Sequence, residues 1–76
     1  MSGNTFSFKV GDTVMIGFSD GGFQGNITDI LEMAGRIFLV YVNTAPKCVQ
    51  YHQNENKWVY GQYGIDPETP CTVRKL

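Results

Sequence analysis

The chain has 76 residues, of which 42% are hydrophobic and 13% aromatic; this is enough for one folded domain, and it excludes intrinsic disorder. The formal net charge of -1 disfavours nucleic acid as a partner, because phosphate-binding domains carry clustered positive charge. No apolar run approaches the ~20 residues of a membrane-spanning helix, and the first residues lack the pattern of a secretory signal. We therefore predict a single cytoplasmic domain with no membrane contact.

The residue types that carry chemistry are sparse. The chain has two cysteines, Cys48 and Cys71, and one histidine, His52. Their spacing matches no metal-ligand motif, and we expect both cysteines to be reduced and partly buried. There is no nucleophile elbow, phosphate-binding loop or paired-carboxylate motif. The sequence predicts no metal site, no catalytic residue and no cofactor, and it favours a protein that is not an enzyme.

Alternating apolar and polar residues predict two strands in the first half of the chain. Four apolar residues of 10–18 share one parity, as in a strand with one buried side: Val10, Val14, Ile16 and Phe18. A glycine-containing turn at 19–22 leads into a second strand at 23–30. The alternation slips at 29–31, which predicts a β-bulge or a sharp bend.

The third predicted strand, residues 36–42, follows a hairpin connection at 32–35 and is apolar on both faces. We expect one face to meet the core and the other to meet a packed loop or a second subunit. Tyr41 is the residue for which we predict an outward, interfacial position. A homo-oligomer is therefore expected.

The rest of the chain is less regular. The fourth predicted strand, residues 47–52, places Val49 and Tyr51 on the face opposite Gln50 and His52. After it we expect, in order, a polar turn, a short extra strand, a loop with two prolines and two glycines, and a final strand: residues 53–56, 57–60, 61–70 and 71–76. No segment has a helical period.

This order of strands resembles the SH3-like barrels, including the Tudor and KOW groups. The resemblance rests on the opening Gly11-Asp12-Thr13-Val14, the glycine-rich turn, the Gly25-Asn26-Ile27 strand and the apolar third strand. It implies an all-β, five-stranded SH3-like barrel with an extended loop before the last strand. Residues 1–8 are expected to form an N-terminal tail and residues 9–76 the single barrel domain.

Aromatic side chains gather between positions 51 and 63. Tyr and Trp are favoured at interfaces because they combine apolar area with a polar tip. In Tudor-like barrels such rings form cages around methylated lysine or arginine; a cap on the barrel is the better-supported alternative here, because no acidic residue is clearly placed to complete a cage. The candidate residues for binding a ligand or partner are Gln50, Tyr51, His52, Trp58, Tyr60 and Tyr63.

Several segments resemble the plasmid-borne type II dihydrofolate reductases, which are SH3-like barrels themselves: Gly11-Asp12-Thr13-Val14, Phe23-Gln24-Gly25-Asn26-Ile27, and Phe38-Leu39-Val40 through Pro46 to Val49-Gln50. The resemblance implies a site in the pore of a homotetramer, with NADPH as cofactor. Gln50 keeps the residue type of that family's Val-Gln-Ile-Tyr motif, but Tyr51 and His52 replace its Ile and Tyr. Ile16 stands where the family has its Lys, and Ala45 where it has its interface His.

We therefore expect a non-enzymatic, self-associating binding module without a cofactor, whose further partner is a protein or peptide. The alternative is a divergent NADPH-dependent reductase of the type II kind. A third hypothesis is a nucleic-acid-binding barrel, which the net charge of -1 disfavours.

Overall fold

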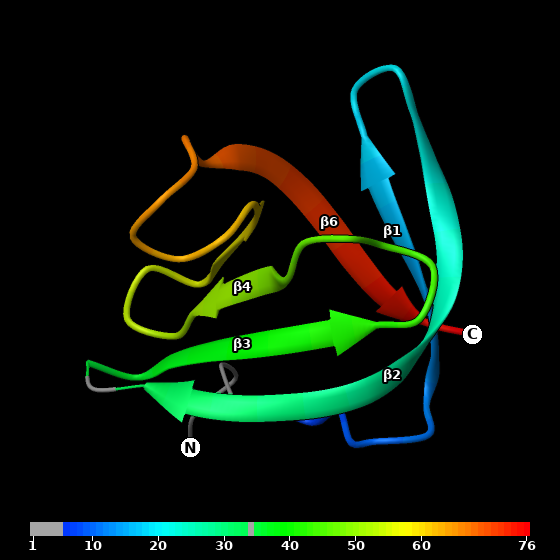
Figure 1. Ribbon diagram of the computed structural model, residues 1–76, viewed down its shortest axis with the longest axis horizontal. Coiled ribbons are helices and arrows are strands. Elements are labelled where there is room, and N and C mark those ends of the chain that lie inside the picture. Colours follow the sequence, from blue (N-terminus) through cyan, green and yellow to red (C-terminus); the bar gives the residue numbers. More distant parts are fainter. Residues whose placement is uncertain (1–5, 34) are drawn as a thin grey trace.

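The computed structural model describes residues 6–33 and 35–76. In it, antiparallel strands close into one barrel in chain order (Figure 1). The strands are β1 (Thr13–Phe18), β2 (Gly21–Met33), β3 (Ile37–Val42), β4 (Val49–His52), β5 (Lys57–Tyr60) and β6 (Thr69–Lys75). The barrel closes because β6 pairs with β5 through its first residues and with β1 through its last. The predicted all-β closed barrel is confirmed.

The predicted count of five strands is wrong, because the described residues form six. The short extra strand expected at 57–60 is β5, a full member of the barrel that pairs with β4 on one side and β6 on the other. The last strand also begins at Thr69 instead of residue 71, so Pro70 lies within it opposite Val59. The extended loop before the last strand therefore covers residues 61–68.

The first strand begins later than predicted. Val10 is 57% exposed, and it precedes a turn in which Gly11 has a φ of 99°. The Lys9 amide donates to Asp12 Oδ2 at 3.0 Å, which fastens this turn. The left-handed backbone at Gly11 interrupts the extended conformation, so β1 starts at Thr13.

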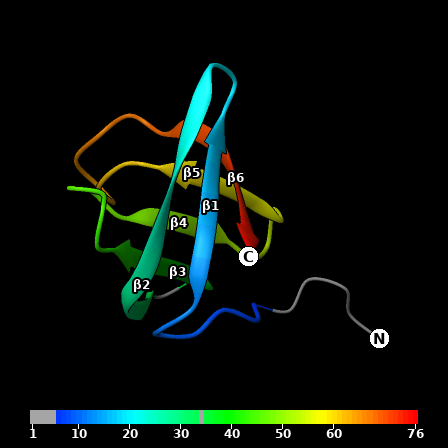
Figure 2. The same ribbon diagram turned by 90° about the vertical axis from the view of Figure 1, so that its right-hand side faces the viewer.

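The longest strand, β2, joins the two halves of the barrel. Its first part pairs with β1 and its second with β3, and the register shifts between Ile27 and Asp29. An irregularity is therefore present as predicted, but it lies before Asp29 instead of at 29–31. Figure 2 shows β1 and β2 in front of β3, β4 and β5, with β2 curving from one group to the other. The predicted hairpin connection at 32–35 is shorter than expected because β2 extends to Met33; Ala34 lies outside the described residues.

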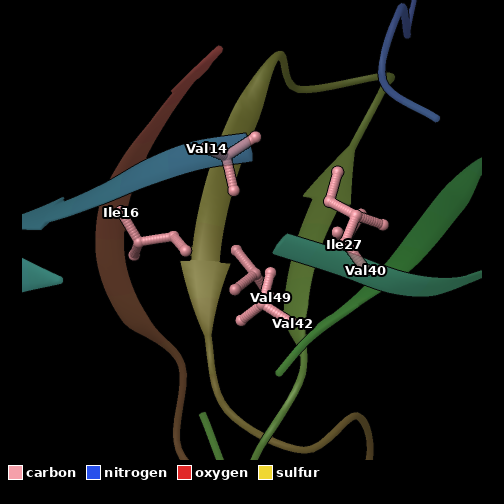
Figure 3. Close-up of a cluster of buried hydrophobic side chains, with 6 residues drawn as sticks. All are labelled: Val14, Ile16, Ile27, Val40, Val42 and Val49. Carbon is pink, nitrogen blue, oxygen red and sulfur yellow. The ribbon is translucent and has the colours of Figure 1, made fainter. Parts of the chain in front are cut away.

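The core is formed by alternate residues of β1 to β4, whose aliphatic side chains point toward one another in the barrel (Figure 3). Each is at most 4% exposed: Val14, Ile16, Ile27, Val40, Val42 and Val49. Burial of a valine or isoleucine side chain contributes ~1.5–3 kcal/mol, so this cluster is the main source of stability. The buried face predicted for the first strand agrees with it at Val14 and Ile16.

Aromatic rings close both ends of the barrel. At one end Phe18 and Phe23 pack against Tyr60, with ring centroids 5.5 and 6.0 Å away. At the other end the residues before β1 pack against the barrel. Phe6 stacks on Phe38 with ring centroids 4.3 Å apart, and Phe8 meets Trp58 edge-on. Of the predicted tail at 1–8, residues 1–5 lie outside the described residues.

Candidate functional site

Gln50 is a buried polar side chain on the outer face of the barrel. Its register partners are Leu39 on β3 and Val59 on β5, both of which are buried, and Gln50 itself is 1% exposed. Its Nε2 donates to the Gly61 carbonyl at 2.7 Å. The Cys48 thiol donates to the same carbonyl at 3.3 Å. These bonds place the start of loop 61–68 over the outer face of β4 (Figure 1).

The amide oxygen of Gln50 is also bonded within the chain. Its Oε1 lies 2.9 Å from His52 Nε2; because a carbonyl oxygen only accepts, the imidazole nitrogen is the donor. His52 Nε2 also lies 3.8 Å from a carboxylate oxygen of Glu68. Gln50 thus bonds directly to the start of loop 61–68, and its neighbour His52 lies near Glu68 at the end of that loop. Both polar atoms of the Gln50 amide are bonded within the chain.

A charged cluster flanks His52. Lys57 Nζ lies 2.8 Å from Glu55 and 3.5 Å from Glu68. The hydrogen bond from Lys57 lowers the pKa of Glu55, and the same bond raises the pKa of Lys57. Both side chains are exposed, so the cluster contributes little stability.

Asp66 holds the middle of loop 61–68. Its Oδ2 accepts from the Gln62 amide at 3.1 Å and lies 3.3 Å from Lys47 Nζ. The Gln62 amide, and to a lesser degree Lys47, lowers the pKa of Asp66 below its ordinary value of 3.8. A backbone hydrogen bond from Asp66 to the Gln62 carbonyl at 3.0 Å completes the turn.

Asp66→Asn should weaken the loop at neutral pH and have no effect in strong acid. The lowered folded-state pKa means that the carboxylate stabilises the loop fully above its unfolded value of 3.8. This contribution is lost as the pH falls through the folded-state pKa. Amide hydrogen exchange in residues 61–68, measured for both proteins from neutral pH down to below about pH 3, checks the prediction. A difference that persists unchanged in acid would contradict it.

The structure does not gather the six predicted binding residues on one surface. They fall in three places: Tyr51 and Trp58 at the end of the barrel closed by Phe6, Tyr60 at the opposite end, and Gln50, His52 and Tyr63 on the outer face and its loop. No aromatic cage is formed by these residues. Tyr63 is the exposed ring among them.

Trp58 belongs to the closed end. Its ring lies 4.7 Å from Tyr51 and meets Phe8 edge-on at 5.4 Å. It packs against the core and is partly buried. The Tyr51 hydroxyl, at the same end, donates to Asn56 Oδ1 at 2.9 Å. These contacts are those of a barrel cap.

An apolar surface that the sequence analysis found only in part lies on the outer faces of β2 and β3. Its members alternate along both strands and pair across them, and we call them the apolar outer face: Leu31, Met33, Ile37, Leu39 and Tyr41. Leu31 is 45% and Met33 37% exposed. Tyr41 was predicted to lie on this side, and its register opposite Asp29 places it there. Leu31 and Met33 are two residues apart, which could have indicated that they share a face of β2. The slip in alternation just before them obscured this pattern in the sequence.

The outer faces of β1, β6 and the first half of β2 are different. Their outward residues are mainly polar: Thr13, Gln24, Asn26, Thr72 and Arg74. The solvated face of an antiparallel sheet is normally of this kind. The exposed Leu31 and Met33 on β2, with the half-buried Ile37 and Tyr41 on β3, therefore differ from these polar outer faces.

A shallow hollow of about 330 Å³ lies where β1 and β6 separate, lined by Gly17, Phe18, Ser19, Pro70, Cys71 and Thr72. Its titratable side chain is Cys71, and burial raises the pKa of that thiol to about 11. Burial likewise raises the pKa of Cys48. Both thiols are free and are protonated at neutral pH, so neither is an activated nucleophile.

Fold and surface together define a small closed all-β barrel with an outer loop layer and one exposed apolar face. Within residues 6–33 and 35–76, no group of three or more His, Cys, Asp or Glu side chains is placed to hold a metal ion. The same residues contain no helix of the length and hydropathy needed to cross a membrane. No protein-family model, curated protein or solved structure matches this chain.

Proposed function

We propose that this chain is a non-enzymatic, self-associating interaction module built on an SH3-like barrel, and that the apolar outer face is its association surface. The observation that carries the proposal is the exposure of Leu31 and Met33 beside Ile37 and Tyr41 on one sheet face. Contiguous exposed apolar side chains on a soluble domain mark interaction surfaces. A second copy would remove these side chains from water.

The size of the domain supports this proposal. A chain of 76 residues buries only about 60% of the surface that its unfolded form exposes. Small domains therefore commonly gain stability by oligomerisation. Loop 61–68 already covers the outer face at Gln50 and Cys48, which leaves the β2 side of that face for a partner subunit.

Two observations weigh against the alternatives. A reductase of the type II kind would need the amide of Gln50, and this amide is buried with both of its polar atoms bonded within the chain. A nucleic-acid-binding barrel would need free cations. Three of the four lysines are within ion-pair distance of carboxylates: Lys47, Lys57 and Lys75.

The protein should sediment as a dimer or tetramer at micromolar concentration. Leu31→Lys and Tyr41→Lys should each dissociate it, because an unpaired charge in a buried interface costs several kcal/mol. Sedimentation velocity and light scattering over a concentration series measure both effects. Leu31 is the sharper test, since its exposure in the single chain lets the fold accept a lysine.

Gln24→Lys is the matched control, because Gln24 is an exposed outward residue on the polar part of β2. It should leave the mass unchanged. A thermal melt of each variant separates loss of association from loss of folding. A monomeric mass for the unmodified protein at high concentration would refute self-association.

A further inference from the structure

Two charged residues stand at opposite ends of the apolar outer face. Asp29 lies opposite Tyr41 at one end. Arg36 immediately precedes Ile37 at the other end, in the hairpin between β2 and β3. Both are exposed, and neither takes part in an ion pair in the described part of the chain. The Asp29 carboxylate accepts a hydrogen bond from the Ile30 amide at 2.9 Å.

Within one chain these two charges are too far apart to pair. Asp29 and Met33 are four residues apart on the same strand, a separation of ~13 Å at 3.3 Å per residue. Arg36 lies beyond Met33, at the hairpin. The register pair Leu31–Leu39 stands midway between the two ends. The face therefore has an acidic end, an apolar middle and a basic end.

Such a face is complementary to itself after a half-turn. A two-fold axis brings residue i of one copy against residue j of the other, and j against i. An axis through the middle of the face would set the acidic end of each copy against the basic end of its neighbour. It would also stack the exposed Leu31 of one copy on Leu31 of the other.

We propose that two copies of this chain pack their apolar outer faces together about a two-fold axis near Leu31 and Leu39, with Asp29 of each copy paired to Arg36 of the other. The inference rests on the proposed self-association and adds the arrangement of the subunits. The partner is a second copy, because one chain supplies both complementary ends. Apolar stacking supplies affinity, and the reciprocal ion pairs select the orientation.

The neighbouring charges are compatible with this arrangement. Glu32, the other charged residue of β2, shares the inward register of Phe38. At the basic end, His52 is opposite Ile37 in register, and its Nε2 is engaged by Gln50 and Glu68. Beyond His52, the carboxylates of Glu55 and Glu68 are paired with Lys57, so among the described residues the nearest unpaired charge to the Asp29 of a partner copy is Arg36.

Charge reversal tests the arrangement. Asp29→Arg and Arg36→Asp should each weaken dimerisation at least about tenfold, because each change converts two attractive contacts of the dimer into two repulsive ones. The double variant Asp29→Arg with Arg36→Asp should return the dissociation constant to within about threefold of the unmodified value. Sedimentation equilibrium measures the constants. Added salt should weaken the unmodified dimer, since exposed ion pairs are screened.

Asp20→Arg and Arg74→Glu are matched controls, because these exposed residues lie away from the apolar outer face; neither should change the dissociation constant. Failure of the double variant to restore association, or single variants that dimerise like the unmodified protein, would overturn the two-fold arrangement while self-association stands. A protein that is monomeric at every concentration would overturn both. Thermal melts identify any variant that fails to fold, and Asp29→Asn and Arg36→Gln then replace the reversals with smaller expected losses.

Discussion

Trp58→Ala should lower the free energy of unfolding by about 3 kcal/mol and could unfold part of the population at room temperature. The indole packs on Tyr51 and Phe8 and caps one end of the core, so truncation leaves a hole between rings. A domain of this length has roughly 4–11 kcal/mol of total stability. A loss of this size should lower the melting temperature by more than about 10 °C.

Tyr63→Ala is the control, because this ring is exposed on loop 61–68 and its removal should change the melting temperature by little. Trp58→Phe should fall between the two, since a smaller ring fills part of the space. Thermal denaturation followed by circular dichroism measures all three. If Trp58→Ala melts like the unmodified protein, Trp58 is not a cap, and a recognition surface becomes the better interpretation.

Gln50→Leu should cost about 2 kcal/mol and loosen loop 61–68. Leucine has a similar volume but offers no acceptor to His52 and no donor to the Gly61 carbonyl, which would keep only the weak bond from the Cys48 thiol. A buried polar group left without a partner costs ~1–3 kcal/mol. Amide exchange in residues 61–68 should accelerate more than exchange in β1, which is far from the substitution.

Gln62→Leu is a suitable control because Gln62 is exposed in the same loop; its backbone amide, which bonds to Asp66, is retained. Denaturant unfolding gives the stability change, and hydrogen exchange with mass spectrometry locates it. Uniform acceleration over the whole barrel, or no change in the loop, would show that Gln50 does not hold the loop.

The two sets of residues in β4 show why part of the fold could be predicted. Val49 and Tyr51 were assigned to one face and Gln50 and His52 to the other, and the structure agrees. The alternation of side chains in a strand is a local property with a period of two, so a few consecutive residues suffice to reveal it. The same reasoning predicted an irregularity in β2, although at 29–31 instead of between Ile27 and Asp29.

The apolar outer face shows what local sequence patterns could not predict. The predicted second strand stopped at residue 30, so Leu31 was assigned to the bulge and Met33 to the hairpin connection, and their outward positions were missed. Before the shift the odd-numbered residues of β2, such as Ile27, face the core; after it, Leu31 and Met33 face outward beside β3. A one-residue shift exchanges the two faces of a strand. Only the pairing with another strand determines where it occurs.

The sequence by itself determined the class of this protein: an all-β barrel with valine and isoleucine inside, glycine at the turns and no helix. These features follow from side-chain period, turn chemistry and backbone preference, all of which act between near neighbours. The tertiary structure alone decided that β5 pairs with both β4 and β6 as a full member of the barrel. It also decided that Phe6 closes one end against Phe38, and that Gln50 is covered by loop 61–68. Each of these depends on contact between segments far apart in the chain, and the free energy of such contacts comes from burial that exists only once the barrel has closed.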